Sequence, residues 1–345
     1  MGVGTVRAAD LDEFVAECDR RGGLGTAATE EYFAGFTYVP ATRVDRSLDP
    51  FSDAYFDQQA ALYREIAGRE INQEEGERTL LDVAAHAAGQ NPYNSPDVGF
   101  IAGHARAIQA CLMIADLPPA AAVLDMGCGW GLSSEMMAFA GTRVTAVDIN
   151  PLFVDLVRRR AARLGLPIEA VESNFDDFDD DREYDLVFFY ECLHHSLRPW
   201  ATLERLARRV KPGGKIMWAG EPMNREWWDS WGLRLHPDAV YCIRKFGWWE
   251  SGWSAEFITE CFARCGFALT IIPDVGWKGT AVGFGVRRET AGGVRPDLSI
   301  RVAHGSAEVE RLRGELAAMR SSRSWRLTAP VRAATRLSQR LLSRR

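Results

Sequence analysis

The stretch that decides the fold is Val123–Gly131, which reads VLDMGCGWG. A short apolar run leads into three glycines, and the residues that follow, 132–140 (LSSEMMAFA), have a helical composition. Glycine lets the backbone approach a ligand closely, and the first turn of a helix offers N–H groups that no helical carbonyl accepts. The stretch therefore predicts a strand, a ligand-binding loop and a helix N-terminus in succession.

Outward from this loop, strand-like and helix-like segments alternate along the chain. We expect strands at 121–126, 143–149, 167–173, 184–190, 215–220, 267–273 and 280–287, and helices at 132–140, 151–164, 199–210 and 255–265. Asn150-Pro151 supplies a helix cap followed by proline at the first helical position. Apolar strands that alternate with amphipathic helices indicate an α/β fold, with a parallel sheet covered on both faces.

The spacing of the glycines separates two kinds of nucleotide-binding loop. The dinucleotide-binding version, GxGxxG, would need its last glycine at position 132, which is Leu132. This chain instead has GxGxG at Gly127, Gly129 and Gly131, preceded by Asp125. That pattern resembles motif I of the class I S-adenosylmethionine-dependent methyltransferases. The resemblance implies a Rossmann-like methyltransferase fold with a mostly parallel seven-stranded sheet.

Three further segments carry the same resemblance. The segment 172–178 (ESNFDDF) is similar to the family motif that meets adenine, 184–196 (YDLVFFYECLHHS) to the fourth motif, and 211–218 (KPGGKIMW) to the turn and strand that follow. The resemblance is continuous over 121–220 and looser over 255–287. It implies that the cofactor is S-adenosyl-L-methionine.

Two cofactor positions have alternatives. Asp148 closes the second strand, where a carboxylate can accept both ribose hydroxyls, and the alternative is that it caps the next helix. The family's usual adenine-binding acid aligns with Asn174, whose carbonyl can accept from an amino group, with Asp176 as the alternative. The resemblance implies cofactor contacts at Asp125, Gly127, Cys128, Gly129, Gly131, Asp148, Ile149, Asn174, Phe175 and Tyr190.

Catalytic candidates are expected where the fourth and fifth strands end. Transfer to a hydroxyl requires a base, and histidine titrates near neutral pH. His195 and then His194 are the first candidates for this base, unless these histidines only hold the loop. Glu191 contacts the substrate or caps the loop, and Glu221 is a further candidate for facing the substrate. His86, His104, His236 and His304 are expected to be structural, and no metal site is expected.

Residues 221–253 form an insertion after the fifth strand, and tryptophan is dense in and just before it. Aromatic faces there would suit a sugar ring, so the insertion is a candidate acceptor wall. The alternative is that these rings are core between the insertion and the N-terminal helices. The tryptophans are Trp218, Trp227, Trp228, Trp231, Trp248, Trp249 and Trp253.

Composition and hydrophobic pattern divide the chain into four parts. Residues 1–118 form a helical N-terminal cap region, with helices at 9–20, 52–67, 76–87 and 97–116, the last of which opens with Ser95 as cap and Pro96 at the first helical position. By resemblance this region covers the cofactor, with Tyr93 near the mouth of the site. Residues 119–288 form the cofactor-binding domain, 289–305 a linker, and 306–345 a basic amphipathic tail.

Charge and composition limit the kinds of partner that the chain is expected to bind. The chain carries a net −6, but residues 301–345 hold eleven arginines and three glutamates, which leaves −14 on the body. An acidic body argues against a nucleic-acid substrate. The tail is expected to contact anionic lipid, or else to be a solvated tail or a partner-binding helix. Its segment 322–332 (SRSWRLTAPVR) is similar to one found in enzymes of bacterial surface-polysaccharide assembly.

Localisation and function follow as expectations. An odd count of seven scattered cysteines, no N-terminal apolar segment and no run near ~18 apolar residues predict a cytoplasmic protein, peripheral at the inner membrane face. The leading hypothesis is an O-methyltransferase acting on a sugar or glycan intermediate. The alternatives are a natural-product methyltransferase acting at oxygen, nitrogen or carbon, and a non-catalytic scaffold. The oligomeric state stays open.

Overall fold

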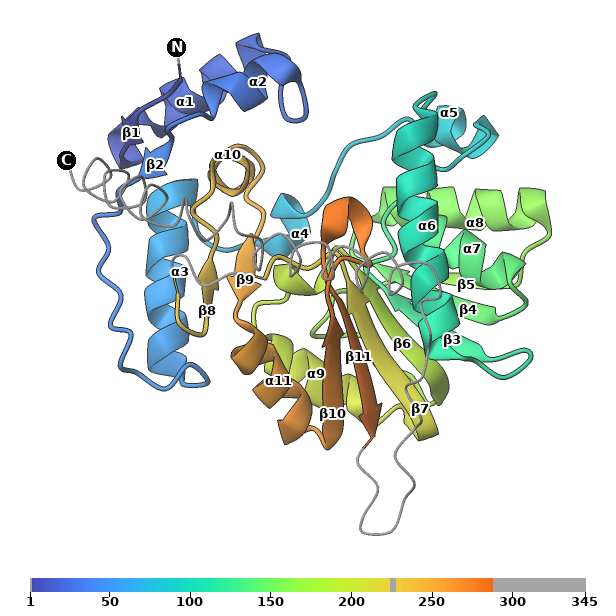
Figure 1. Cartoon of the computed structure of the whole chain (residues 1–345). Helices are drawn as coiled ribbons and strands as arrows, with labels where there is room; N and C mark the ends of the chain where they lie inside the picture. The colour runs from blue at the N-terminus through green and yellow to red at the C-terminus, as the bar shows by residue number, and fades with distance from the viewer. Residues whose placement is uncertain (1, 224–227, 288–345) are drawn as a thin grey trace, which may run out of the picture. The chain divides into compact units, whose positions relative to one another are not determined.

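A computed structural model describes residues 2–223 and 228–287 of the chain (Figure 1). The predicted linker (289–305) and basic tail (306–345), with Trp227, lie outside the described residues. The interpretations given to them from sequence therefore stay predictions.

The central sheet has seven strands in the order β10-β11-β7-β6-β3-β4-β5 (Figure 1). Strands β5, β4, β3, β6 and β7 are parallel, and β11 runs antiparallel to both of its neighbours. The mostly parallel seven-stranded sheet expected from the sequence is confirmed. The strands are β3 (Ala122–Met126), β4 (Arg143–Asp148), β5 (Ile168–Glu172), β6 (Tyr184–Tyr190), β7 (Val210–Ala219), β10 (Phe267–Ile272) and β11 (Val282–Arg287).

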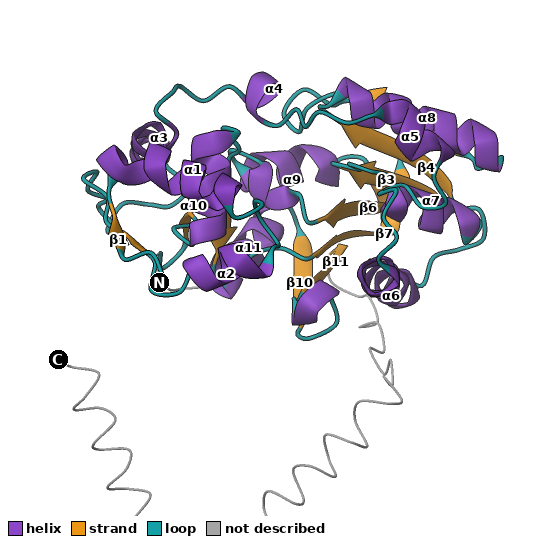
Figure 2. Cartoon of the chain, turned by 90° about the horizontal axis from the view of Figure 1, so that it is seen from above, coloured by secondary structure: helices purple, strands orange, loops and turns teal. Residues whose placement is uncertain are grey.

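Helices cover both faces of this sheet (Figure 2). Strand β6 shows why, since Leu186 and Phe188 point into one buried cluster while Val187 and Phe189 point into the other. A strand that is apolar on both faces must be covered on both. One face carries α6 (Val98–Ala115), α7 (Leu132–Phe139) and α8 (Pro151–Leu164), and the other carries α9 (Pro199–Ala207) and α11 (Ala255–Arg264).

Side-chain caps set where several helices begin. The Asn150 side chain accepts from the N–H of Leu152 at the start of α8, as the Asn-Pro pair predicted. Helix α6 begins later than expected, because Asp97 is its cap and accepts from the N–H of Phe100. The predicted start at Ser95-Pro96 is therefore wrong by two residues. A cap of this kind contributes about 1 kcal/mol, enough to shift a helix boundary.

The N-terminal region is helical, as expected, with one small parallel strand pair, β1 (Thr5–Val6) and β2 (Thr37–Tyr38). The single helix predicted at 76–87 is wrong, because the chain forms two short helices with a loop between them. Asn72 caps the first helix and Asp82 caps the second. The helices are α1 (Leu11–Arg20), α2 (Ala27–Tyr32), α3 (Asp53–Ala67), α4 (Gln73–Gly76) and α5 (Val83–Ala88).

The tryptophan-rich insertion folds as β8 (Trp231–Leu233), α10 (Pro237–Lys245) and β9 (Ser251–Trp253). Helix α10 packs against α1 and α3, so two segments far apart in sequence share one core (Figure 1). Trp231 packs against Tyr55 with tilted rings, 5.3 Å between centroids, and donates through Nε1 to the Pro50 carbonyl at 2.7 Å. Trp218, Trp228, Trp231, Trp249 and Trp253 are buried, so core packing is their role.

Helix α6 is long and apolar enough to cross a membrane by length and composition alone. One such helix is weak evidence, and α6 places Ala107, Ile108 and Cys111 against the sheet. It also directs the buried His104 toward the carboxyl ends of the strands. Its role in the fold is that of a covering helix.

A buried ion pair fastens the N-terminal region to the sheet domain, and it yields a stability prediction. Arg160 on α8 is almost fully buried, pairs with Glu135 of α7 and donates to the carbonyls of His86 and Gly89. Removing one partner of a buried pair costs about 3–5 kcal/mol because a charge is left unpaired. We expect Arg160→Met to lower the free energy of unfolding by about that amount.

The measurement is urea unfolding of the full chain followed by circular dichroism. Arg159→Met is the matched control, because Arg159 is the next residue on α8 and forms an exposed pair with Asp155. We expect this control to unfold like the wild type, since exposed pairs add little. Equal stability of the two variants would contradict the role given to Arg160.

Candidate functional site

A cavity of about 490 Å³ lies where β3, β4 and β6 end. Met126, Asp148 and Tyr190, the last residues of these strands, all line it. The carboxyl ends of strands in an open parallel sheet are where ligands bind, and the volume suits a small-molecule site. The cavity is therefore the candidate active site.

The glycine loop forms one wall of the cavity and needs its glycines. Gly127, Gly129 and Gly131 have φ values of +66°, +49° and +86°. A Cβ on Gly127 would lie 2.8 Å from Cβ and Sγ of Cys192, and one on Gly131 would lie 2.6 Å from a methyl of Val157. Gly127, Cys128 and Gly129 line the cavity, whereas Gly131 begins α7 and lets α8 pack close by.

Asp125 lies beneath the loop instead of in the cavity wall. Its carboxylate is fully buried and accepts from the hydroxyls of Ser133 (2.7 Å) and Ser134 (2.5 Å) at the start of α7. Burial raises the pKa of Asp125 to about 6. The carboxylate thus holds the helix start that faces the cavity, and a direct contact with the cofactor stays a prediction.

Asp148 connects the loop to the next helix and also lines the cavity. Its two oxygens accept from the N–H of Asn150 and of Gly129, each at 2.8 Å. Burial raises its pKa to about 6. The alternative role of helix cap falls to Asn150. Ile149 lines the cavity beside Asp148, so both residues lie where the sequence predicted.

The segment after β5 contributes Asn174 and Phe175 to the cavity wall. The Asn174 side-chain carbonyl accepts from the N–H of Asp176 (2.8 Å) and of Asp177 (2.6 Å), which forms a tight turn. The Asp176 carboxylate instead faces the Thr202 hydroxyl at 3.5 Å. Of the two sequence candidates, Asn174 is therefore the one at the cavity.

The far end of the cavity holds a titratable group, the Glu191 carboxyl. Glu191 has φ = +53°, and Gly220 leaves room for it, since a Cβ on Gly220 would lie 2.2 Å from Cγ of Glu191. Burial, with repulsion from Glu221, raises the pKa of Glu191 to about 7. A carboxyl with such a pKa exchanges a proton readily at neutral pH. An uncommon backbone conformation at such a position favours a functional role.

His104 lies beside this carboxyl, although sequence reasoning gave it no functional role. Its Nδ1 is 2.7 Å from the Tyr190 hydroxyl and 3.9 Å from Oε2 of Glu191. Burial, together with the nearby Lys278, lowers the pKa of His104 to about 4. The imidazole is therefore neutral at neutral pH and orients Tyr190. The contact between His104 and Tyr190 spans 86 residues, and no spacing pattern in α6 could have predicted it.

The two consecutive histidines after β6 have different surroundings. His194 is buried, and its Nδ1 lies 2.8 Å from Oε2 of Glu221. Glu221 also accepts from the N–H groups of Cys192, Leu193 and His194, each at 3.0 Å. Although burial opposes it, these contacts lower the pKa of Glu221. Glu221 therefore fastens the loop, and it is buried behind the residues that line the cavity.

His195 lines the cavity, as does Glu77 from the loop after α4. Nδ1 of His195 lies 3.2 Å from Oε2 of Glu77. Burial alone would lower the pKa of His195, but attraction to Glu77, with Glu250 and Glu221 adding to it, raises the pKa to about 9. His195 thus holds its proton at neutral pH, and its role as a base stays a prediction.

Aromatic rings complete the wall at this end. Trp277 stacks on His104 with ring centroids 4.5 Å apart and lies flat against Gly103, while Tyr93 lies 5.7 Å from the same imidazole. Trp248 of the insertion also lines the cavity. The expectation that the insertion contributes to the wall therefore applies to Trp248, while its other described tryptophans are core.

Comparison with known proteins supports the reading of this site. A family model described as "Methyltransferase domain" matches residues 123–214. That range contains the glycine loop, Asp148, Glu191 and both histidines. Residues 123–214 thus form a methyltransferase domain, and the fold is the Rossmann-like methyltransferase fold.

Curated relatives match the same part of the chain. The chain is similar to ubiquinone biosynthesis O-methyltransferases from Erwinia tasmaniensis, at 32% identity over 132 residues, and from Xanthomonas axonopodis pv. citri, at 37% over 101 residues. The first match covers 36% of this chain and 54% of the relative, and the second covers 29% and 42%. The chain spans about half the length of the curated relatives it matches.

Solved structures give weaker likenesses. A SAM-dependent methyltransferase from Aquifex aeolicus superposes with a TM-score of 0.44 at 17% identity, over 60% of this chain and 100% of that chain. The 1,6-didemethyltoxoflavin-N1-methyltransferase from Burkholderia thailandensis gives 0.43 at 19% identity, over 60% and 85%. Likenesses at this level carry no inference about activity.

The raised pKa of Glu191 makes a prediction about stability and pH. The folded protein holds this proton up to about pH 7, whereas an unfolded glutamate loses it near pH ~4.3. The ionised carboxyl therefore destabilises the fold as pH rises through that window. Glu191→Gln removes the effect, so its melting temperature relative to wild type should be higher at pH 8 than at pH 5.

Thermal unfolding of both proteins at the two pH values is the measurement. Glu183→Gln is the control, because Glu183 is exposed and its variant should keep the same offset at both pH values. A Glu191→Gln offset that is independent of pH would show that the carboxyl has an ordinary pKa.

Proposed function

We propose that this chain is an S-adenosylmethionine-dependent methyltransferase that methylates a hydroxyl of a small-molecule acceptor, with a sugar or glycan intermediate as the leading class. One observation carries the proposal. The glycine loop is hydrogen-bonded to the Asp148 carboxylate on one side of the cavity, and the perturbed Glu191 carboxyl lines the same cavity. A binding loop and a candidate base thus line the same cavity.

The residues at the loop fit the cofactor. Packing against Cys192 leaves no room for a Cβ on Gly127, and the bare backbone of this glycine lines the cavity, where a ligand can approach it closely. The Asp148 carboxylate faces the same space with two oxygens, which match a pair of ribose hydroxyls. When bound, S-adenosylmethionine supplies a methyl group on a positively charged sulfur.

Glu191 is the proposed base. An acceptor hydroxyl that becomes an ether must lose its proton, and a base with a pKa near the working pH removes it efficiently. Glu191 has a pKa of about 7 and lines the cavity. His104 and Tyr190, held together at 2.7 Å, fix the polar wall next to it. The chain's contribution is mostly the positioning of the acceptor against the methyl group.

The acceptor class rests on the cavity wall. Trp248 and Trp277 offer flat faces of the kind on which sugar rings stack, and Glu77, Gln73 and His195 offer polar groups between them. The second candidate is a methyltransferase for an aromatic natural product, which Tyr93 and Phe100 in the same wall favour. The ubiquinone-biosynthesis names of the relatives favour this second candidate too.

The basic tail supports a place at the membrane in this proposal. Eleven arginines among residues 301–345 would attract an anionic lipid surface by about 1 kcal/mol each when near it. A cytoplasmic protein held at the inner face of the membrane would meet lipid-linked glycan intermediates of polysaccharide biosynthesis. The non-catalytic scaffold remains as the alternative outcome of the tests that follow.

Cofactor binding is the first test. We expect Asp148→Asn to weaken S-adenosylmethionine binding about 10- to 100-fold, because hydrogen bonds to a charged group contribute about 1.5–3 kcal/mol. Isothermal calorimetry on the full chain measures this, with Asp155→Asn on the exposed side of α8 as control. Absence of binding to folded wild-type protein would overturn the proposal and leave the scaffold.

Dependence on pH is the second test, with nucleotide sugars, glycosides and phenols as the acceptor panel. With the best acceptor, kcat/KM should rise with pH and level off above about 7, since Glu191 must be ionised to act as base. Glu191→Gln should lower the rate about 10²- to 10⁴-fold and remove that rise. An unchanged profile in Glu191→Gln would exclude Glu191 as the base.

A further inference from the structure

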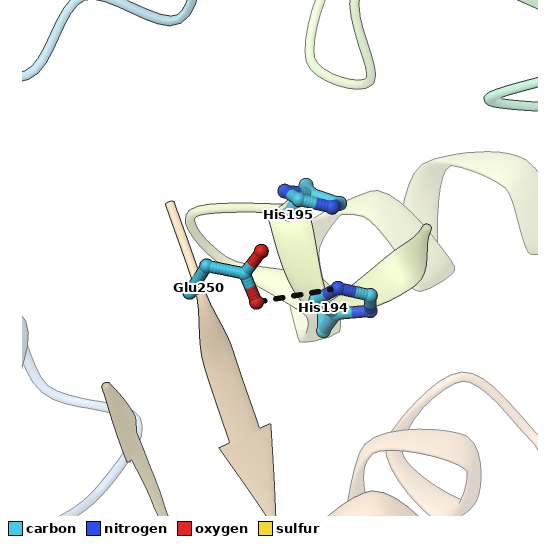
Figure 3. A group of neighbouring side chains, drawn as sticks. All are labelled: His194, His195 and Glu250. Carbon is cyan, nitrogen blue, oxygen red and sulfur yellow. Dashed lines mark ion pairs between the residues drawn. The ribbon is translucent and has the colours of Figure 1, made fainter. Parts of the chain in front are cut away.

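Two segments far apart in sequence bring His194, His195 and Glu250 together (Figure 3). The histidines end the short 3-10 turn η2 (Leu193–His195) after β6, and Glu250 precedes β9 of the insertion. One ligand atom from each residue lies within 4.8 Å of the others. Figure 3 shows Glu250 facing His194 across their ion pair, 3.7 Å between Oε2 and Nε2, with His195 beside them. Glu77 approaches His195 from the N-terminal region.

The hydrogen bonds of His194 fix which nitrogen is free. Nδ1 faces the Glu221 carboxylate at 2.8 Å, and a carboxylate can only accept, so Nδ1 carries the proton. In the neutral ring Nε2 then has a lone pair, which points at the acceptor oxygen of Glu250. A lone pair and a carboxylate oxygen 3.7 Å apart can share a bound cation, and Arg234 already contacts the same oxygen of Glu250 from the other side at 2.9 Å. A histidine oriented by a carboxylate through its other nitrogen is the arrangement found around bound metals.

The charges around the histidines point the same way. Glu77, Glu221 and Glu250 surround them, and Arg234 pairs with Glu250 at 2.9 Å. Before any proton on the imidazoles is counted, these three carboxylates and one guanidinium carry a net charge of two minus in a mostly buried place. Buried charges need compensation, and a divalent cation supplies the amount required.

We propose that His194 Nε2, His195 and Glu250 bind a divalent first-row transition metal, with Glu77 completing the set. Two imidazoles with carboxylates suit zinc, iron and related ions. Ligand atoms about 2.1 Å from such an ion lie roughly 3.4 Å apart in a tetrahedral site, close to the 3.7 Å between His194 and Glu250. The backbone is held in place by Gln73, which donates to the His195 carbonyl, and Ser251, which donates to that of His194.

The proposed ion would face the cavity. His195 and Glu77 line the cavity wall together with Trp248, while His194 lies behind them. Ions of this class can bind more than four ligands, so an ion there could also bind an acceptor oxygen and would polarise the bound hydroxyl. This role rests on the proposed function, whereas metal binding itself does not. The sequence predicted no metal site, because the ligands come from segments with no ligand-like spacing.

Metal binding by the full chain, free of any affinity tag, tests the proposal. Metal content is first measured as purified, and the protein is then stripped with EDTA and titrated with Zn²⁺ by calorimetry and with Co²⁺ by visible absorption. We expect one equivalent per chain. His195→Gln and Glu250→Gln should each weaken Zn²⁺ binding at least tenfold, and Glu221→Gln should weaken it about 10- to 100-fold by releasing His194.

Glu204→Gln is the control variant, because Glu204 is exposed on α9 and should leave Zn²⁺ binding unchanged. His195→Gln is the decisive variant if Glu250→Gln fails to fold, since His195 sits at the cavity wall. No stoichiometric Zn²⁺ or Co²⁺ binding, or binding that both ligand variants retain, would overturn the metal site. Calorimetry with S-adenosylmethionine on the stripped protein keeps the two proposals separate, because loss of the metal site alone leaves that binding intact.

Discussion

The site depends on one buried carboxylate, that of Glu221. It accepts three successive backbone N–H groups and the Nδ1 proton of His194, so it sets the path of the chain after β6. Glu191 comes just before that path and His195 at its end. Both face the cavity because the residues between them are pinned from behind. A carboxylate with four such partners tolerates burial that an isolated charge would not.

Two parts of the molecule hold the residues around Glu221 in place: the central sheet, and the core that the N-terminal region shares with the insertion. The sheet presents the ends of β3, β4 and β6, and the N-terminal region shares a core with the tryptophan-rich insertion. Tyr63 donates to the Gly247 carbonyl, and Glu77 accepts from the N–H of Trp249. These hydrogen bonds join the N-terminal region to the insertion across more than 170 residues. Fully burying an aromatic ring contributes roughly 1.5–3 kcal/mol, which explains why so many tryptophans gather there.

The cofactor side could be predicted from sequence because its signals are local. Three glycines at fixed spacing, an acid at the end of the next strand and an Asn-Pro cap each act within a few residues, and the structure places Gly127, Asp148 and Ile149 at the cavity. Strand and helix periodicity likewise predicted the seven strands and their covering helices. The break between α4 and α5 was not predicted. The apolar spacing is typical of one helix, but two side-chain caps start two separate helices.

The part of the cavity proposed for the acceptor could not be predicted, because its contacts join residues with no pattern in common. His104 meets Tyr190 from a covering helix, Glu77 meets His195 from a loop, and Glu250 meets His194 from the insertion. Each residue taken alone reads as an ordinary surface or core position. The sequence made His195 the first candidate for the base. It gave no sign that Glu77 lies beside His195 and raises its pKa, because that contact depends on the tertiary structure.

The cavity wall is built partly from the sheet and partly from other segments, and this has a consequence for how the protein's specificity can evolve. The wall around the glycine loop belongs to the sheet, whereas Trp248, Glu77 and Gln73 belong to segments outside the domain match at 123–214. Substitutions in those segments would reshape the pocket for a new acceptor without disturbing the strands that position the loop. The proposed acceptor wall and the glycine loop thus lie on different segments, and a directed-evolution library confined to 246–250 would vary the first while leaving the strands behind the second unchanged.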